Sequence, residues 1–136
     1  MSDKVHFYKH RVRYADTDKM GVVYHGRYFE WFEAARTEML RDAGYPYQKI
    51  ETSGILLPVI EANCKYFQPI LYDELVTVKT TLQSFTKAKI WLAYEVYIEN
   101  HDFPKAEGYT IHCYMNQKGK PVRATQELVG FFRSLH

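Results

Sequence analysis

The sequence of 136 residues is poor in cysteine, and its two cysteines exclude a fold built on disulfide bonds. Cys64 and Cys113 make at most one bridge, whereas disulfide-dense scaffolds need several. A structural zinc site needs several cysteine or histidine ligands at short spacing, but His112 and Cys113 would point to opposite faces of a strand. We therefore expect no structural metal and no bound cofactor.

The sequence also lacks an excess of charge of one sign and a long apolar run. Eighteen Lys and Arg are interspersed with sixteen Asp and Glu, so there is no basic tract for a nucleic-acid backbone. No stretch approaches the ~20 apolar residues that span a bilayer, and the first residues, MSDK, do not resemble a secretion signal. We expect a cytoplasmic protein with no nucleic-acid partner.

Apolar residues make up 46% of the chain and aromatic residues 16%, which is enough for a hydrophobic core. The length is that of one ordinary domain, so we expect residues 1–136 to form a single domain. Apolar side chains recur with helical spacing over residues 25–43, which corresponds to about 28 Å of helix. Gly44 and Pro46 end this helix, because glycine can adopt a left-handed cap and proline cannot continue the turn.

The rest of the chain is predicted to be mostly β-structure. A weakly alternating first strand covers residues 5–14, and a short last helix follows Thr125. Further segments alternate with a period of two, and short breaks between them favour antiparallel hairpins. These segments are residues 57–67, 74–86, 88–99 and 105–116. The sequence therefore predicts an α+β domain with one long helix on an antiparallel sheet, and its uncovered apolar surface favours self-association.

Reactive side chains are densest just before the long helix, between Tyr14 and His25. The first turn of a helix presents unpaired N–H groups and about half a positive charge, which can hold an oxygen that gains negative charge. Asp18 is placed to act as base or nucleophile on a carbonyl that amides near His25 polarise. The same segment also fits a plain turn and helix cap, and Asp16, Asp18 and His25 also fit a metal site.

The run from Tyr14 to Arg36, YADTDKMGVVYHGRYFEWFEAAR, resembles the signature of the 4-hydroxybenzoyl-CoA thioesterase family of hot-dog enzymes. Within that family it is similar to the Tol-Pal-associated acyl-CoA thioesterase branch. The match is specific, because many residue types recur at set spacings over the whole run. Residues 69–75 also match the Pro-x-x-x-Asp-x-Leu turn of the family, so the resemblance covers nearly the whole chain. Ala15 stands where Glu is common in the branch, and Gly26 where Ala is common.

The resemblance implies a hot-dog fold, in which a curved antiparallel sheet wraps around the central helix. It also implies subunits joined edge to edge as a homodimer or homotetramer, with active sites at their interface. The implied reaction is hydrolysis of an acyl-CoA thioester, with Asp18 as nucleophile or general base and the His25 amide as oxyanion hole. Tyr14 and the His25 side chain match further polar positions of the site, and Asp16 serves the turn.

Coenzyme A would bring phosphate groups, which need Lys or Arg side chains at the mouth of the site, commonly from another subunit. The candidates for this contact are Lys65, Lys87, Lys89 and Arg123. The resemblance leaves acyl carrier protein open as an alternative carrier of the acyl group, and it suggests peripheral association with the inner membrane. The sequence does not decide the length or the aromatic character of the acyl group.

Two other functions stay open at this stage. A hot-dog hydroxyacyl dehydratase pairs a histidine with a helix glutamate, and Glu30 and Glu33 are available for this role. However, the Gly- and Pro-rich segment that follows the histidine in those enzymes is missing after His25. The alternative of a different class is a non-catalytic protein that binds acyl-CoA or acyl carrier protein, or that acts as a scaffold at the envelope.

Overall fold

The structure, a computed structural model, describes residues 4–136, which form a five-stranded sheet, a two-stranded sheet, one long helix and several short elements. No helix in this range is long and apolar enough to cross a membrane. In chain order the elements are β1 (Val5–Arg11), the 3-10 turn η1 (Tyr14–Asp16), α1 (Arg27–Asp42), α2 (Tyr47–Thr52), β2 (Ile55–Leu56), β3 (Val59–Tyr66), β4 (Leu75–Phe85), β5 (Lys89–Ile98), β6 (Ala106–Cys113), β7 (Met115–Asn116) and α3 (Gln126–Leu135).

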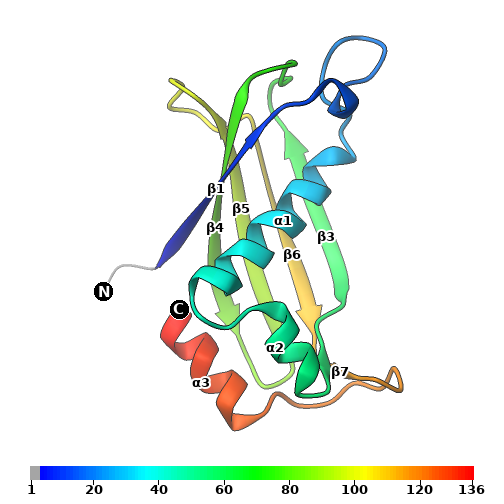
Figure 1. The fold of residues 1–136 in the computed structure, drawn as a ribbon, viewed down its shortest axis with the longest axis vertical. Helices are drawn as coiled ribbons and strands as arrows, with labels where there is room; N and C mark the ends of the chain where they lie inside the picture. The colour runs from blue at the N-terminus through cyan, green and yellow to red at the C-terminus, as the bar shows by residue number, and fades with distance from the viewer. Residues whose placement is uncertain (1–3) are drawn as a thin grey trace.

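The described residues form a five-stranded antiparallel sheet in the spatial order β1-β4-β5-β6-β3. Figure 1 shows α1 running across one face of this sheet, with β1 at one edge and β3 at the other. The short strands β2 and β7 pair separately. The predicted α+β arrangement, one long helix on an antiparallel sheet, is therefore confirmed.

The structure differs from the prediction mainly in short elements. The first strand ends at Arg11, because the chain turns into η1 three residues later. Sequence analysis missed α2, which begins after Pro46 and is anchored by the fully buried Ile50. The last helix begins as predicted, since the Thr125 side chain accepts a hydrogen bond from the Leu128 amide at 3.1 Å.

The core lies between α1 and the sheet, and its centre is a stacked pair of aromatic rings. Phe32 of α1 is fully buried and lies parallel to Tyr94 of β5, with the ring centroids 4.2 Å apart. Gly108 of β6 lies beneath Phe32, and a Cβ there would come within 2.9 Å of the Phe32 ring and even closer to the Asn63 carbonyl oxygen. Glycine at this position therefore allows the helix to pack closely on the sheet.

β3 is an open edge of the sheet. It pairs with β6 on one side, and no strand in the described part of the chain pairs with its other side. Several large apolar side chains are exposed on or just after this strand, including Val59, Ile60, Tyr66 and Phe67. An edge with unpaired backbone groups and exposed apolar side chains is a surface onto which another strand can pair.

Candidate active site

The segment before α1 folds into a narrow hairpin that spans residues 16–24. A backbone hydrogen bond of 2.9 Å from the Tyr24 amide to the Asp16 carbonyl joins the ends of its two arms. At the tip, the amide of Gly21 donates to the Asp18 carbonyl at 3.0 Å, and Gly21 adopts a φ of +80°, which favours glycine. Asp18 therefore lies at the tip of the hairpin, and the second arm leads directly into α1.

The Asp18 side chain is oriented by the turn that it begins. Its Oδ1 accepts a hydrogen bond from the Met20 amide at 2.8 Å. Its Oδ2 accepts no hydrogen bond from any group between residues 4 and 136. The carboxylate is thus held in place through one oxygen, while the other oxygen is available to a reactant.

The N-terminus of α1 presents an amide that points outward. The Tyr24 carbonyl accepts a hydrogen bond from the Arg27 amide at 2.9 Å, and in a trans peptide the next N–H points the opposite way. The His25 N–H therefore points away from the helix, and it finds no acceptor within the described residues. The N-cap residue, Gly26, has no side chain that could cap these amides. The His25 amide is thus a donor of the kind that stabilises a developing oxyanion.

Asp18 and His25 share one pocket of about 280 Å³, which we call the Asp18 pocket. Its other lining residues come from the hairpin, from α1, and from the end of β3 and the segment after it. They are Val22, Val23, Tyr28, Tyr66, Phe67, Gln68 and Pro69. The structure therefore brings the candidate carboxylate and the candidate amide together, and it adds a wall from β3 that sequence analysis did not identify.

Tyr66 connects this wall to the start of α1. Its hydroxyl donates a hydrogen bond to the His25 carbonyl at 2.9 Å, and its ring packs edge-on against Tyr28 with the centroids 4.9 Å apart. Burial raises the pKa of Tyr66, so the phenol keeps its proton at neutral pH and remains a donor. Sequence analysis missed this residue, because only the packing of β3 beside α1 brings Tyr66 and His25 together.

Tyr14 lies outside the Asp18 pocket. Its side chain is 80% exposed, and its ring lies edge-on to Tyr72 with the centroids 6.0 Å apart. Tyr14 is not among the residues that line the pocket. Within one chain, therefore, the structure does not place the Tyr14 hydroxyl next to Asp18 and His25.

Asp16 is buried, and it does not line the Asp18 pocket. Its Oδ2 accepts hydrogen bonds from His10 Nε2 at 2.8 Å and from the Arg13 amide at 2.9 Å. Burial alone raises the pKa of Asp16, but these hydrogen bonds outweigh it and leave the pKa below its ordinary value. In the part of the chain that the structure describes, no three His, Cys, Asp or Glu side chains converge as metal ligands would, so Asp16, Asp18 and His25 form no such cluster.

The four basic candidates lie in two places. Lys87, Lys89 and Arg123 are close in space, because the Ala124 amide donates to the Lys87 carbonyl at 3.0 Å. Figure 1 shows the β4–β5 turn at the end of the sheet opposite to the segment that precedes α1. Lys65 lies on β3 and lines a different depression. None of these four side chains lines the Asp18 pocket of its own chain.

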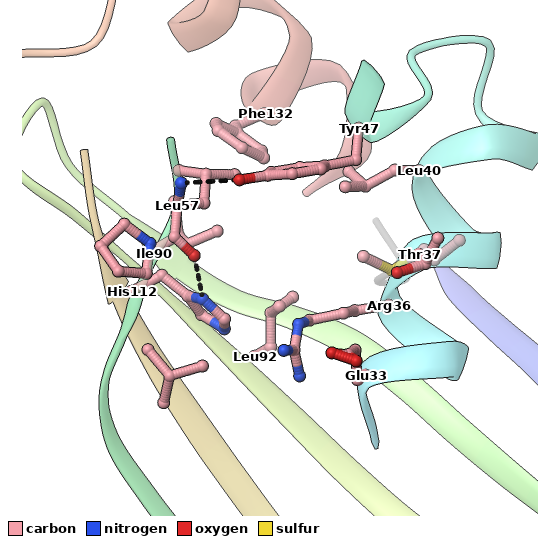
Figure 2. A pocket seen from close by; sticks show the side chains of 13 residues that line it. Glu33, Arg36, Thr37, Leu40, Tyr47, Leu57, Ile90, Leu92, His112 and Phe132 are labelled. Atoms are coloured by element: carbon pink, nitrogen blue, oxygen red, sulfur yellow. Dashed lines mark hydrogen bonds between the residues drawn. The ribbon is translucent and has the colours of Figure 1, made fainter. Parts of the chain in front are cut away.

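A second pocket of about 300 Å³ lies between the C-terminal half of α1 and the sheet, and we call it the inner pocket. Figure 2 shows Phe132 and Tyr47, from α3 and α2, at one side of this pocket, and Arg36 from α1 pointing into it. Most of its walls are apolar, with Leu40, Leu57, Ile90, Leu92 and Phe132 among the lining residues. Its size and lining are typical of a site for an apolar group.

His112 in the wall of the inner pocket is a neutral imidazole. Its Nδ1 donates to the Leu57 carbonyl at 3.0 Å, so its Nε2 is the acceptor for the Thr110 hydroxyl at 2.8 Å. Burial lowers the pKa of His112 to about 4, with a smaller contribution from the positive charge of Arg36. Since this pKa lies well below 7, His112 stays neutral at pH 7, and its hydrogen bonds to Leu57 and Thr110 fix its ring in the wall of the pocket.

Known proteins share this fold and this sequence pattern. Residues 12–132 match the Thioesterase-like superfamily, and the chain belongs to this family. A putative esterase of Aquifex aeolicus is 35% identical over 122 residues, which cover 90% of this chain and 93% of the relative. The acyl-CoA thioester hydrolase YbgC of Escherichia coli O157:H7 is 30% identical over 124 residues, which cover 90% of this chain and 92% of YbgC.

A solved structure of a thioesterase has the same fold as this chain. The crystal structure of DHNA-CoA thioesterase from Staphylococcus aureus matches with a TM-score of 0.90 and 31% identity, covering 96% of this chain and 90% of that chain. The resemblance seen in the Tyr14–Arg36 motif and the predicted hot-dog fold are therefore confirmed. The chain is an enzyme, a thioester hydrolase.

Proposed function

We propose that this hydrolase cleaves acyl-CoA thioesters to the free acid and coenzyme A. The observation that carries the proposal is the Asp18 pocket, which is lined by both Asp18 and His25 and lies at the N-terminus of α1. The names of two relatives, the YbgC thioester hydrolase and the staphylococcal thioesterase, support an acyl-CoA substrate.

In the proposed reaction Asp18 acts on the carbonyl carbon of the thioester. Its free Oδ2 either attacks this carbon to form a mixed anhydride, which water then hydrolyses, or it takes a proton from a water molecule that attacks. In both cases the electron pair of the carbonyl double bond moves onto the carbonyl oxygen. The bond between carbon and sulfur then breaks, and the thiolate of coenzyme A leaves.

The His25 amide and the positive end of α1 stabilise the oxygen that gains this charge. Loss of one such donor typically raises the barrier by about 2.7–4 kcal/mol. The leaving thiol has an ordinary pKa near 8.5, so the thiolate departs with little help from an acid. A carboxylate and a polarising amide are therefore sufficient, and no catalytic triad is required.

We infer that two copies of the chain pair through β3. Two-fold symmetry makes the paired strands antiparallel, so the Tyr66 end of one β3 lies beside the Val59 end of the other. Tyr66 lines the Asp18 pocket, whereas Val59 lines the inner pocket. The inner pocket of one subunit then lies next to the Asp18 pocket of the other, where it can receive the acyl group.

The residues that contact coenzyme A, the other partners and the location of the protein remain predictions. Since Lys87, Lys89 and Arg123 gather far from the Asp18 pocket of their own chain, we expect another subunit to supply the side chains that contact the phosphates of coenzyme A. A homotetramer would bring such side chains from a neighbouring dimer. Acyl carrier protein as a carrier, a cytoplasmic location and peripheral association with the inner membrane are likewise expectations.

The geometry does not favour the dehydratase alternative. That reaction needs a helix glutamate beside the histidine, but Glu30 forms an ion pair with Arg27 at 3.0 Å, and Glu33 lines the inner pocket. Neither glutamate lines the Asp18 pocket. No observation favours the non-catalytic binding or scaffolding alternative over hydrolysis.

The proposal is tested by measuring thiol release from acetyl-, octanoyl-, palmitoyl- and benzoyl-CoA. We expect the wild type to hydrolyse at least one of them and Asp18→Asn to lower kcat by about 100-fold or more, since positioned acid–base groups contribute about 10²–10⁴-fold. Asparagine keeps the Oδ1 that accepts from the Met20 amide, so the turn is preserved. The panel also identifies the acyl class.

A matched control is Asp73→Asn, which removes another exposed carboxylate. Asp73 has a φ of +70°, a conformation that asparagine adopts readily, so the variant should fold and keep full activity. A folded wild type that hydrolyses none of the four thioesters would contradict the proposal. Full activity in Asp18→Asn would contradict the assigned role of Asp18.

A further inference from the structure

Two histidines of β1 contact aspartates in almost the same way, and one of these pairs lies at the base of the 16–24 hairpin. His10 Nε2 lies 2.8 Å from Asp16 Oδ2, and His6 Nε2 lies 2.7 Å from Asp42 Oδ2. Both histidine side chains are 16% exposed. The aspartates differ, since the Asp42 side chain is 64% exposed and the Asp16 side chain is 1% exposed. Only the first pair has a buried carboxylate.

Hydrogen-bond donors stabilise the buried Asp16 carboxylate. It accepts hydrogen bonds from His10, from the Arg13 amide at 2.9 Å and from the Arg13 guanidinium at 3.3 Å. The Arg13 side chain is 65% exposed, so His10 is the better-shielded of the two side-chain donors. Burying a carboxylate that has lost a hydrogen-bond donor costs free energy. The local backbone then shifts until the carboxylate contacts water or another donor.

The backbone of Asp16 links this buried carboxylate to both groups of the Asp18 pocket. Its carbonyl accepts a hydrogen bond from the Tyr24 amide at 2.9 Å, and Tyr24 immediately precedes His25. Asp18 follows two residues after Asp16 on the other arm. A shift of Asp16 therefore moves the Asp18 carboxylate and the His25 amide relative to each other.

His10 also ties the hairpin to α1. Its ring packs against Trp31, with the ring centroids 5.3 Å apart, and Trp31 is buried in the second turn of α1. Neither His10 nor Asp16 lines the Asp18 pocket. The pair therefore contacts the hairpin, the first strand and the helix whose N-terminus carries the His25 amide, without lining the Asp18 pocket.

We propose that His10 and Asp16 are positioning residues for thioester hydrolysis, which hold the hairpin so that Asp18 and the His25 amide face the same carbonyl group. This inference rests on the proposed function. A displacement of about 1 Å in a catalytic group lowers a rate by about 100-fold. Because the other hydrogen bonds of the hairpin remain, we expect the loss of the His10 donor to lower kcat by about 10-fold.

The test compares His10→Leu with His6→Leu. The two substitutions remove equivalent bonds from the same strand and from equally buried histidines, but only the first bond holds the hairpin. We expect His10→Leu to lower kcat about 10-fold with KM changed less than about 2-fold, and His6→Leu to keep the kcat of the wild type. His10→Gln should recover most of the lost rate, because its amide nitrogen can donate to Asp16 from a position close to that of Nε2.

A second measurement does not depend on activity. Amide hydrogen exchange of Asp18 and Tyr24, whose amides bond across the hairpin, reports whether its arms stay paired. We expect faster exchange at both amides in His10→Leu and unchanged exchange in His6→Leu. The folded state of each variant is checked by circular dichroism, and all rates are measured well below its midpoint of thermal unfolding.

The outcomes separate the two proposals. If the wild type hydrolyses none of the thioesters but the hairpin amides exchange faster in His10→Leu, the proposed function is contradicted. The structural part of the inference is then kept. A His10→Leu variant with wild-type kcat, or with wild-type exchange at Asp18 and Tyr24, overturns the positioning role. Equal losses in His10→Leu and His6→Leu also overturn it, because they would show a general effect on stability.

Discussion

The hydroxyl of Tyr66 provides a direct test of how the N-terminus of α1 is prepared for catalysis. Tyr66→Phe removes this hydroxyl and keeps the ring, which can still pack against Tyr28 and His25. The lost bond runs from the hydroxyl to the His25 carbonyl at 2.9 Å. Without it, the peptide group that follows the candidate oxyanion donor keeps only the longer bond of 3.4 Å from the Tyr28 amide to the His25 carbonyl and is less firmly oriented.

The size of the effect follows from the energy of one neutral hydrogen bond, about 0.5–1.5 kcal/mol. If all of this energy is needed to keep the His25 amide aligned with the carbonyl oxygen in the transition state, kcat falls by about 2-fold to about 13-fold, since about 1.36 kcal/mol corresponds to a factor of ten. KM should change little, because the Tyr66 hydroxyl is already bonded to the protein. The free energy of unfolding should fall by no more than about 1.5 kcal/mol.

The assay is thiol release from the best acyl-CoA substrate of the wild type, with kcat and KM measured separately. Tyr109→Phe is the matched control, because the Tyr109 hydroxyl donates to Glu61, away from the Asp18 pocket. Strand alternation places Tyr109 on the face opposite to Gly108, which lies under Phe32. Unchanged kcat in Tyr66→Phe, or an equal loss in Tyr109→Phe, would refute the reasoning.

Two further predictions concern the pH dependence of stability and the open sheet edge. Because burial holds the pKa of His112 at about 4, below its ordinary 6.5, the unfolded chain binds the proton more tightly, and stability is lost as the pH falls from 6.5 toward 4. In urea titrations the free energy of unfolding should therefore fall more steeply over this range for the wild type than for His112→Asn, and equal slopes would contradict this account. Ile60, which is 48% exposed on β3, should be needed for pairing of two copies. Ile60→Glu is expected to convert dimers to monomers in light scattering, and a dimer that persists would show that the copies pair elsewhere.

Most of the fold was predictable because its signals are local. The apolar spacing between residues 25 and 43 predicts α1, which the structure places at Arg27–Asp42. The alternation around Ile90 predicts β5, in which successive side chains alternate between buried and half-buried. The short elements were harder, since α2 depends on the burial of Ile50 against distant residues and carries little periodicity of its own.

The residues of the candidate site also divide into those that the sequence predicts correctly and those that it does not. Asp18 and His25 were identified from sequence because both lie within one short segment before the helix, and the structure places them in one pocket. Tyr14 belongs to the same segment and to the same motif, yet its side chain is 80% exposed and outside that pocket. Proximity in sequence predicts that residues share a region, but the direction of each side chain depends on how the backbone turns.

The sequence by itself determined the class of protein, because the residue types and spacings of one continuous segment, Tyr14–Arg36, resemble the family signature and place a carboxylate in a turn before a helix N-terminus. Only the tertiary structure decided which residues support that chemistry. Tyr66 reaches His25 from the end of β3, and His10 reaches Asp16 from β1. The Tyr66 contact joins elements that sheet pairing and burial of the α1 face bring together, and the His10 contact depends on how the backbone turns between β1 and η1.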